Sequence, residues 1–86
     1  MKGLNFIPMQ VEVLYFALVR DLVGKDRELI KFTGKTTSDL RKLLEHKYPQ
    51  IGKVLKVSRI AVNGEYYEGE LKEGDTVAII PPVSGG

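Results

Sequence analysis

The amino-acid sequence predicts a single α+β domain, in which one mixed sheet of about five strands has one main helix packed across one face. Three observations support this prediction. Several short segments rich in β-branched and aromatic residues alternate apolar and polar positions, as strands do. One longer segment repeats its leucines at helical spacing, and an Asn-Gly pair joins two of the strand-like segments. A chain of 86 residues has room for one domain only.

The composition excludes several classes of protein. Hydrophobic residues make up 43% and charged residues 28% of the chain, which is ordinary for a globular domain. No apolar run approaches the ~20 residues that cross a bilayer, and the net charge of +2 is small and evenly spread, so we expect neither membrane nor nucleic-acid binding. The first eight residues lack the features of a signal peptide, which predicts a cytoplasmic protein.

An extension and a strand are predicted at the start of the chain. Residues 1–8 are weakly patterned and are expected to be a poorly ordered extension, whereas the domain itself is expected to span residues 9–80. Residues 10–17 predict a strand. Its inward face would hold Val11, Val13 and Tyr15. Its other face begins polar and ends with Leu14 and Phe16, which is typical either of a partner surface or of a face covered by a helix.

A short helix and a second strand follow. The spacing of Val19, Leu22 and Val23 predicts one or two helical turns, and Gly24 is suited to end them. Residues 27–32 alternate in the manner of a strand, so the first two strands should flank the short helix.

The longest helix is predicted over residues 37–48. Thr36 is the expected N-cap, and Asp39 places negative charge at the positive end of the helix dipole. The buried stripe would hold Leu40, Leu43, Leu44 and Tyr48. The side facing water would hold Arg41, Lys42, Glu45 and Lys47. Arg41 and Glu45 are four residues apart, so we expect them to form an ion pair across one helical turn.

The second half of the chain predicts a hairpin. Residues 50–58 suit either a helical turn or an irregular strand. Asn63-Gly64 tolerates the positive φ angles of a tight turn, so residues 60–67 are expected to form two short antiparallel strands. Adjacent residues of a strand point to opposite faces, so one of Tyr66 and Tyr67 should lie on the outer side.

A polar loop and a last strand complete the domain. The loop over residues 68–75 has Leu71 as its apolar anchor, and residues 76–80 predict the strand. Because one long helix can cover only one face of the sheet, this order of elements fits a β-grasp domain. The uncovered face should hold an exposed apolar patch beside the root of the C-terminal tail. Its expected members are Phe16, Tyr66 or Tyr67, and Ile80.

The chain contains no set of residues for catalysis on its own. Cysteine is absent, and the single histidine, His46, has neither a nucleophile to activate nor a second metal ligand, so we expect a solvated surface residue. The glycines lack the spacing of phosphate-binding loops, and carboxylates such as Glu68 and Glu70 fall in the polar loop. We therefore expect no enzyme activity, bound metal or bound cofactor in the isolated chain.

The chemically distinctive segment is the tail over residues 81–86, which reads Pro-Pro-Val-Ser-Gly-Gly. Pro81 and Pro82 favour a stiff, extended spacer, whereas Gly85 and Gly86 let another protein close tightly around the chain. Six extended residues reach roughly 20 Å. A partner that uses ATP could convert the terminal carboxylate to an acyl adenylate. Since the chain has no thiol, any sulfur it carries would be held on that carbonyl as a thiocarboxylate.

Several segments match the motifs of a known family. They are residues 13–17, 19–24, 36–44, 61–63, 74–78 and 81–86. With these motifs the chain resembles, over residues 10–86, the ubiquitin-like β-grasp sulfur carriers and, within them, the small subunits of molybdopterin synthase. A diglycine ending alone is shared with ubiquitin and with thiamine-pathway carriers. The diproline tail, combined with Arg-Asp-Leu-Val-Gly after the first strand, is more specific.

The resemblance implies a role for the tail. An activating enzyme of the ubiquitin-E1 type would use ATP to adenylate Gly86, and a sulfur donor would convert it to a thiocarboxylate. The tail would then enter the active site of the large subunit and give its sulfur to cyclic pyranopterin monophosphate, on the route to a molybdenum or tungsten cofactor. In the family, two small subunits sit at the ends of a large-subunit dimer, which makes a heterotetramer. The residues entering that site would be Pro81, Pro82, Val83, Ser84 and Gly85.

The resemblance also assigns an interface. Phe16, Tyr66 and Ile80 match the positions of the family's apolar contact surface, in agreement with the patch expected from strand alternation. Arg20 matches an arginine near that interface, although a salt bridge within the chain would equally explain it. Residues 1–8 extend beyond the usual start of the family.

Three other functions are compatible with the sequence. A lysine amine could capture the activated Gly86, which would make the chain a protein modifier. The chain could also carry sulfur for thiamine thiazole synthesis, although the diproline ending fits the molybdopterin family better. The third is a plain binding module whose tail has no chemical role.

Overall fold

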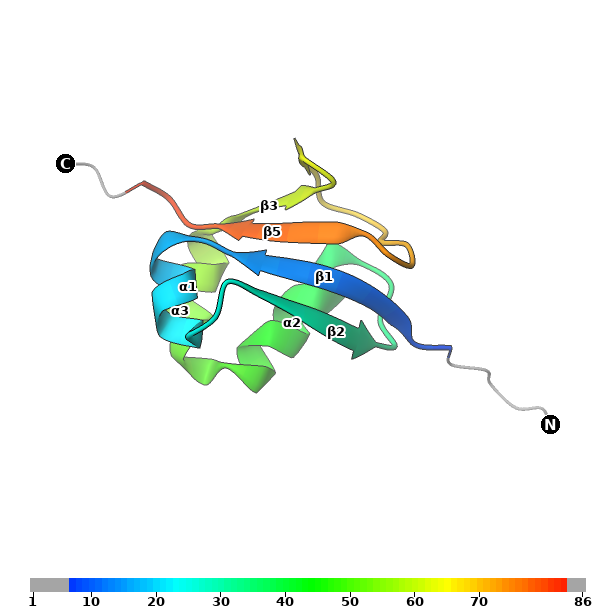
Figure 1. Cartoon of the computed structure of the whole chain (residues 1–86), viewed down its shortest axis with the longest axis horizontal. Helices are drawn as coiled ribbons and strands as arrows, with labels where there is room; N and C mark the ends of the chain where they lie inside the picture. Colours follow the sequence, from blue (N-terminus) through cyan, green and yellow to red (C-terminus); the bar gives the residue numbers. More distant parts are fainter. Residues whose placement is uncertain (1–6, 84–86) are drawn as a thin grey trace.

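The computed structural model describes residues 7–83, which form one five-stranded sheet with helices packed against one face (Figure 1). The elements are β1 (Met9–Tyr15), α1 (Ala17–Val23), β2 (Arg27–Phe32), α2 (Thr37–Lys47), η1 (Pro49–Ile51), α3 (Gly52–Val57), β3 (Arg59–Val62), β4 (Glu65–Tyr66) and β5 (Thr76–Ile80). The strand order is β2-β1-β5-β3-β4; β1 and β5 run parallel, and the other neighbours are antiparallel. The predicted α+β class with a mixed sheet is confirmed.

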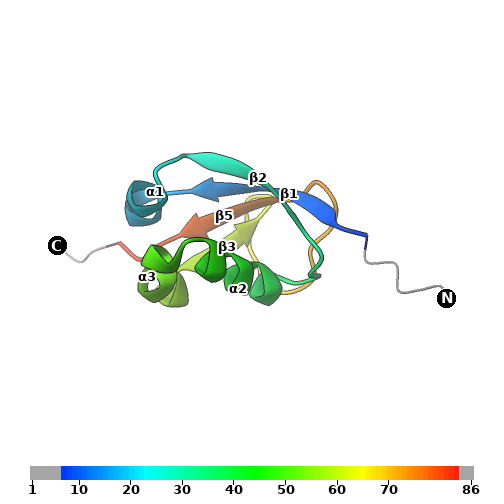
Figure 2. The ribbon, with the colours of Figure 1, turned by 90° about the horizontal axis from the view of Figure 1, so that it is seen from below.

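The core lies between the sheet and its helices. Helices α2 and α3 lie beneath one face of the sheet, and α1 lies beyond the end of β1 (Figure 2). The fully buried residues of β1 and β5 lie on the faces that alternation predicted, namely Val11, Val13, Tyr15, Val77 and Ile79. Leu40 and Leu44 of α2 pack against them from the helical layer. The opposite face of the sheet, called the open face below, carries no helix from the described part of the chain (Figure 1).

Helix α2 begins with a full capping box. The Thr36 side chain accepts a hydrogen bond from the Asp39 backbone N–H, and the Asp39 carboxylate accepts one from the Thr36 N–H. These bonds satisfy donors that the first helical turn leaves free. A further hydrogen bond from the Lys35 N–H makes the largest contribution to lowering the pKa of Asp39. The predicted cap of the main helix is thus confirmed, and the capping box is complete.

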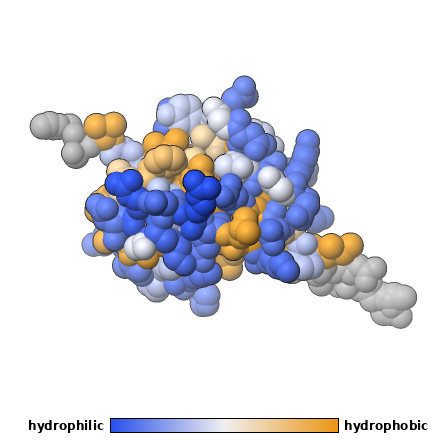
Figure 3. Space-filling view, viewed as in Figure 1, coloured by the Kyte–Doolittle hydropathy of each residue, from blue (hydrophilic) through white to orange (hydrophobic). Residues whose placement is uncertain are grey.

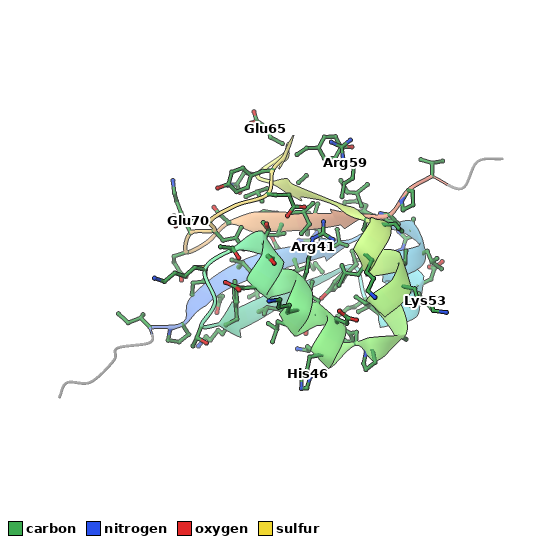
Figure 4. The ribbon with its side chains drawn as sticks, turned by 180° about the vertical axis from the view of Figure 1, so that it is seen from behind. Arg41, His46, Lys53, Arg59, Glu65 and Glu70 are labelled. Atoms are coloured by element: carbon green, nitrogen blue, oxygen red, sulfur yellow. The ribbon has the colours of Figure 1, made fainter. Side chains whose placement is uncertain are left out.

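The expected solvent exposure of Arg41 is wrong. Among the described residues, Arg41 forms no ion pair with Glu45. Its guanidinium donates to the backbone carbonyls of Leu55 and Ser58, over 2.7 and 2.9 Å, and to a Glu68 carboxylate oxygen over 2.7 Å (Figure 4). Those carbonyls end helix α3 and lie beside α2 in space, which helical spacing alone does not show. Arg41 therefore joins α2, α3 and the loop after β4.

The structure settles one segment that was left open and shifts the ends of two predicted elements. Residues 50–58, left open between a helix and a strand, are helical over η1 and α3. The first strand, expected to reach residue 17, ends at Tyr15, because Phe16 is the N-cap of α1 and Ala17 begins that helix with a φ of 49°. The longest helix, α2, ends one residue earlier than predicted. Among residues 7–83, no helix is long and apolar enough to span a membrane.

A polar cluster joins β1, β2 and the end of α2. The hydroxyls of Tyr15 and Tyr48 donate to one Glu28 carboxylate oxygen over 2.9 and 2.7 Å, and Lys47 Nζ lies 2.7 Å from the other oxygen. Burial by itself would raise the pKa of Glu28, but the hydrogen bonds from Lys47, Tyr48 and Tyr15 outweigh it and lower that pKa to about 2. Burial and the bond to Glu28 raise the pKa of Tyr15. The carboxylate is therefore ionised whenever the fold is intact near neutral pH.

Candidate functional site: the tail root and the open face

Strand register lines up one row of side chains across the open face. Leu14 of β1 is paired with Ala78 of β5, Ala78 with Ala61 of β3, and Ala61 with Tyr66 of β4. Paired residues point to the same side of a sheet, so these four side chains share the open face. The row is apolar except for the hydroxyl at its Tyr66 end.

The next row lies closer to the C-terminal tail. Ile80 of β5 is paired with Arg59 of β3, and Phe16 follows the last registered pair between β1 and β5, Tyr15 with Ile79. Phe16 is 43% exposed. The sequence left open whether the outer face of the first strand is a partner surface or is covered by a helix. The exposure of Phe16 shows that the end of this face is uncovered.

Together the two rows form what we call the tail-root patch. Its members are Leu14, Phe16, Ala61, Tyr66, Ala78 and Ile80. The space-filling view shows apolar side chains gathered on the open face, close to where the C-terminal segment leaves the domain, with hydrophilic side chains around them (Figure 3). The three residues expected to form an apolar patch, Phe16, Tyr66 and Ile80, are brought together by the fold.

The two adjacent tyrosines take different positions. Tyr66 lies on the open face, 57% exposed, and Tyr67 follows the end of β4, where its hydroxyl donates to the Glu70 carbonyl. The tight turn before them is confirmed, because Asn63 and Gly64 have φ angles of 52° and 91°. The choice between the tyrosines, which alternation left open, is made by the pairing of Ala61 with Tyr66.

The tail leaves the domain at the patch. Pro81 is still buried, whereas Pro82 is exposed and Val83 is 93% exposed. The free part of the tail therefore begins at Pro82, directly after Ile80 and Pro81. Ser84, Gly85 and Gly86, which the sequence singles out, lie outside the described residues.

Arg20 borders the same surface. Leu14, Phe16, Arg20 and Arg27 line one shallow hollow at the end of β1. The Arg20 guanidinium lies 3.9 Å from the Asp21 carboxylate, with both side chains mostly exposed, which is a weak ion pair in water. Arg20 is therefore near the patch and available to a partner.

A stacked cation at the far side of the patch was missed by the sequence reasoning. The guanidinium carbon of Arg59 lies 3.5 Å from the centre of the Tyr66 ring, within the range of a cation–π interaction. Arg59 precedes Ala61 by two residues, and Ala61 faces Tyr66, so the two side chains are diagonal neighbours on one face. The sequence signal for this pair is the alternation of side chains along residues 59–62, which puts Arg59 and Ala61 on one face. It identifies Tyr66 as the neighbour only when the register of the hairpin is known.

The polar loop is more structured than expected. The Glu68 carboxylate accepts hydrogen bonds from Arg41 and from the Thr37 hydroxyl, both over 2.7 Å. Burial opposes its ionisation, but these two bonds prevail and lower the pKa of Glu68. Glu68 thus lies in the predicted polar loop with its side chain 55% exposed, and its carboxylate also fastens this loop to α2. Leu71 is buried, as predicted.

The described residues offer a binding surface with no reactive constellation. His46 is exposed on α2 and points away from the sheet (Figure 4). Within residues 7–83, no group of three histidine, cysteine or acidic side chains is arranged to hold a metal ion. An exposed apolar patch of this kind is typical of surfaces that bind another protein.

Comparison with known proteins places the chain among small carrier proteins. The ThiS family model matches residues 13–86. The chain is 42% identical over 83 residues to the molybdopterin synthase sulfur carrier subunit of Dictyostelium discoideum, covering 90% of this chain and 96% of that protein. It is 39% identical over 83 residues to the human protein of the same description, covering 90% and 94%.

Solved structures share the architecture. Subunit 1 in the complex of subunits 1 and 2 of the molybdopterin-converting factor from Helicobacter pylori matches with a TM-score of 0.67 and 30% identity, over 91% of this chain and 100% of the matched chain. Small archaeal modifier protein 1 from Methanosarcina acetivorans matches with a TM-score of 0.79 and 27% identity, over 93% and 99%. The predicted ubiquitin-like β-grasp fold is thereby confirmed.

Proposed function

Because the chain belongs to the ThiS family, we propose that it is the sulfur carrier subunit of a molybdopterin synthase. The observation that supports this most directly is the likeness to sulfur carrier subunits over nearly the whole chain. The Dictyostelium discoideum protein, for example, is 42% identical. The open face adds a physical reason, since it presents an exposed apolar patch at the place where the tail leaves the domain.

The working group in this proposal is the carboxylate of Gly86. Its oxygen attacks the α-phosphate of ATP in an activating enzyme, pyrophosphate leaves, and an acyl adenylate forms. A sulfur nucleophile from a donor then displaces AMP, which leaves a thiocarboxylate on Gly86. The ATP belongs to the activating enzyme, and this chain contributes the acyl group and binds no cofactor of its own. Glycine suits both displacements, because no side chain obstructs attack at the carbonyl.

Delivery of that group depends on the described part of the tail. Since Pro81 is buried and Pro82 and Val83 are exposed, five residues of sequence follow the buried end of the domain, and five residues in extended conformation span up to about 17 Å. Pro82 restricts its own φ and directs the segment away from the sheet. The tail-root patch would bind the large subunit around this exit, so that the tail reaches the active site and returns as a carboxylate after transfer of its sulfur to cyclic pyranopterin monophosphate.

The large subunit is the expected partner. The Helicobacter pylori structure is described as a complex of subunits 1 and 2 of a molybdopterin-converting factor, and its subunit 1 shares this fold. An assembly of two such carriers on a large-subunit dimer follows as part of the proposal. In this assembly our chain donates the sulfur, and the large subunit supplies the catalytic residues. We place this chemistry in the cytoplasm.

A second function is favoured by one observation. The likeness to small archaeal modifier protein 1 concerns a protein described as a modifier. In that role, a lysine amine of a target protein would displace AMP from the Gly86 adenylate and form an isopeptide bond. Both functions share the first step and differ in the nucleophile that follows.

The mass of the protein isolated from its host separates the two functions. Carriage predicts one oxygen-to-sulfur replacement located on Gly86, and modification predicts Gly86 remnants on lysines of other proteins. Deleting Gly86 should abolish sulfur transfer while thermal unfolding stays unchanged. Pterin conversion that persists in the deletion variant would overturn the carrier mechanism.

A further inference from the structure

We propose that Arg59, held over the ring of Tyr66, binds a carboxylate of the large subunit at the rim of the tail-root patch and so helps select that partner. This inference rests on the proposed function and adds to it a charged contact and the chemistry of the group it meets.

Arg59 lies where a docked partner must pass. It is paired with Ile80, the last strand residue before the tail, and it is exposed on the same face. A protein that covers Ile80 and Phe16 while receiving the tail therefore also meets the side chain of Arg59. The position is at the border of the apolar rows, which is where interfaces place their polar contacts.

Stacking on Tyr66 prepares the guanidinium for such a contact. The guanidinium carbon is 3.5 Å from the ring centre, so one flat side of the group is covered by the ring. The N–H donors lie in the plane of the guanidinium and stay available at its edge, in the fork geometry that matches a carboxylate. The stack also reduces the freedom that this long side chain loses on binding, since its position is already restricted.

No carboxylate of the described domain forms an ion pair with Arg59. Arg20, Arg27 and Arg41 each have a carboxylate oxygen within 4.0 Å, belonging to Asp21, Glu12 and Glu68. Within residues 7–83, none of the ion pairs involves Arg59. A partner with an Asp or Glu at this border would complete the pair, whereas a partner with a cation there would be repelled. That difference is a means of selection.

The test measures binding of the full-length chain to the purified large subunit by calorimetry at two salt concentrations. Arg59→Gln should weaken binding about tenfold, the equivalent of ~1.4 kcal/mol, and Arg59→Glu about a hundredfold or more. Arg59→Lys should fall between wild type and the Gln variant, because it keeps the charge and loses the fork. The salt dependence of binding should be weaker in Arg59→Gln than in wild type.

The matched control is Lys53→Glu, which makes the same change of charge on α3, on the helical side of the domain (Figure 4). It should change affinity less than about twofold, because α3 lies on the face opposite the patch. Thermal unfolding of every variant checks the fold. Tyr66→Phe should leave binding close to wild type, since the ring remains, and Tyr66→Leu should weaken it.

The outcomes separate this inference from the proposed function. If Arg59→Glu binds within twofold of wild type while Phe16→Glu fails to bind, the contact with a carboxylate is overturned and the docking patch stands. If both variants bind normally, the docking surface itself is misassigned. If Arg59→Glu impairs only adenylation, the carboxylate belongs to the activating enzyme, and the assignment to the large subunit is overturned.

Discussion

Arg41 Nη2 lies 2.7 Å from a carboxylate oxygen of Glu68, and the same guanidinium also binds the backbone carbonyls at the end of α3. One side chain of α2 thereby fastens both α3 and the loop that leads into β5. The Arg41 side chain is 24% exposed, so these bonds are partly shielded from water. Removal of the Arg41 side chain would leave the Leu55 and Ser58 carbonyls and the Glu68 carboxylate without this donor, so Arg41 should stabilise the fold.

Arg41→Ala should destabilise the domain by about 2–3 kcal/mol, because it leaves two carbonyls and one carboxylate without their charged donor. Urea unfolding followed by circular dichroism measures the free energy of unfolding. Lys42→Ala, at the exposed neighbouring position of the same helix, controls for helix propensity and should cost less than about 0.5 kcal/mol. Equal losses in the two variants would contradict the bracing role of Arg41.

Glu28 should make the fold sensitive to acid. Its pKa is lowered from 4.5 to about 2 in the folded chain, so the stabilisation is complete above pH 4.5 and is lost as the pH falls towards 2. The shift corresponds to ~3 kcal/mol, and the side chain is only 12% exposed.

Glu28→Gln is therefore expected to be less stable than wild type at pH 7, and the difference should shrink between pH 4.5 and 2. Stability measured by urea unfolding across this range provides the test. Glu45→Gln, at an exposed position of α2, should follow wild type throughout. If the free energy of unfolding of Glu28→Gln falls with pH just as it does in wild type, the cluster does not hold the Glu28 carboxylate ionised.

Ala17 adopts a backbone conformation that favours glycine. Its φ of 49° falls in the left-handed region, where a Cβ costs about 1–2 kcal/mol. Ala17→Gly should stabilise the fold by roughly 0.5 kcal/mol, since relief of strain exceeds the added entropy of the unfolded chain. Ala78→Gly in β5 should destabilise it by about 0.5–1 kcal/mol. Thermal unfolding measures the Tm of each variant. A lower Tm in Ala17→Gly as well as in Ala78→Gly would contradict the strain at Ala17.

The tail-root patch should bind the large subunit through its apolar members. Phe16→Glu places a charge where an exposed ring now lies, and we expect at least about a hundredfold loss of affinity, as for a central interface residue. Adenylation by the activating enzyme should persist. Val57→Glu changes another exposed apolar residue, which lies on α3, and serves as the control. Calorimetry that finds the two variants equally weakened, or equally unaffected, would show that the patch is misplaced.

Local patterns anticipated much of the fold. Alternation in β1 and β5 identified the buried faces, the Asn63-Gly64 pair identified the hairpin, and Thr36 identified the start of α2. Such features depend on residues close in sequence, whose geometry is set by backbone sterics and short hydrogen bonds. The patch residues Phe16 and Ile80 could also be proposed, because an apolar residue at the end of a polar face is visible in a single strand.

The sequence by itself determined the strands, the main helix, the apolar ends of two strands and the chemistry available to the tail. Tertiary structure alone decided the helical state of residues 50–58, the partners of Arg41, the choice of Tyr66 for the open face and the stack beneath Arg59. Each of these depends on which distant segments become neighbours. Strand register and helix packing set those neighbours, and neither is encoded in the periodicity of one segment.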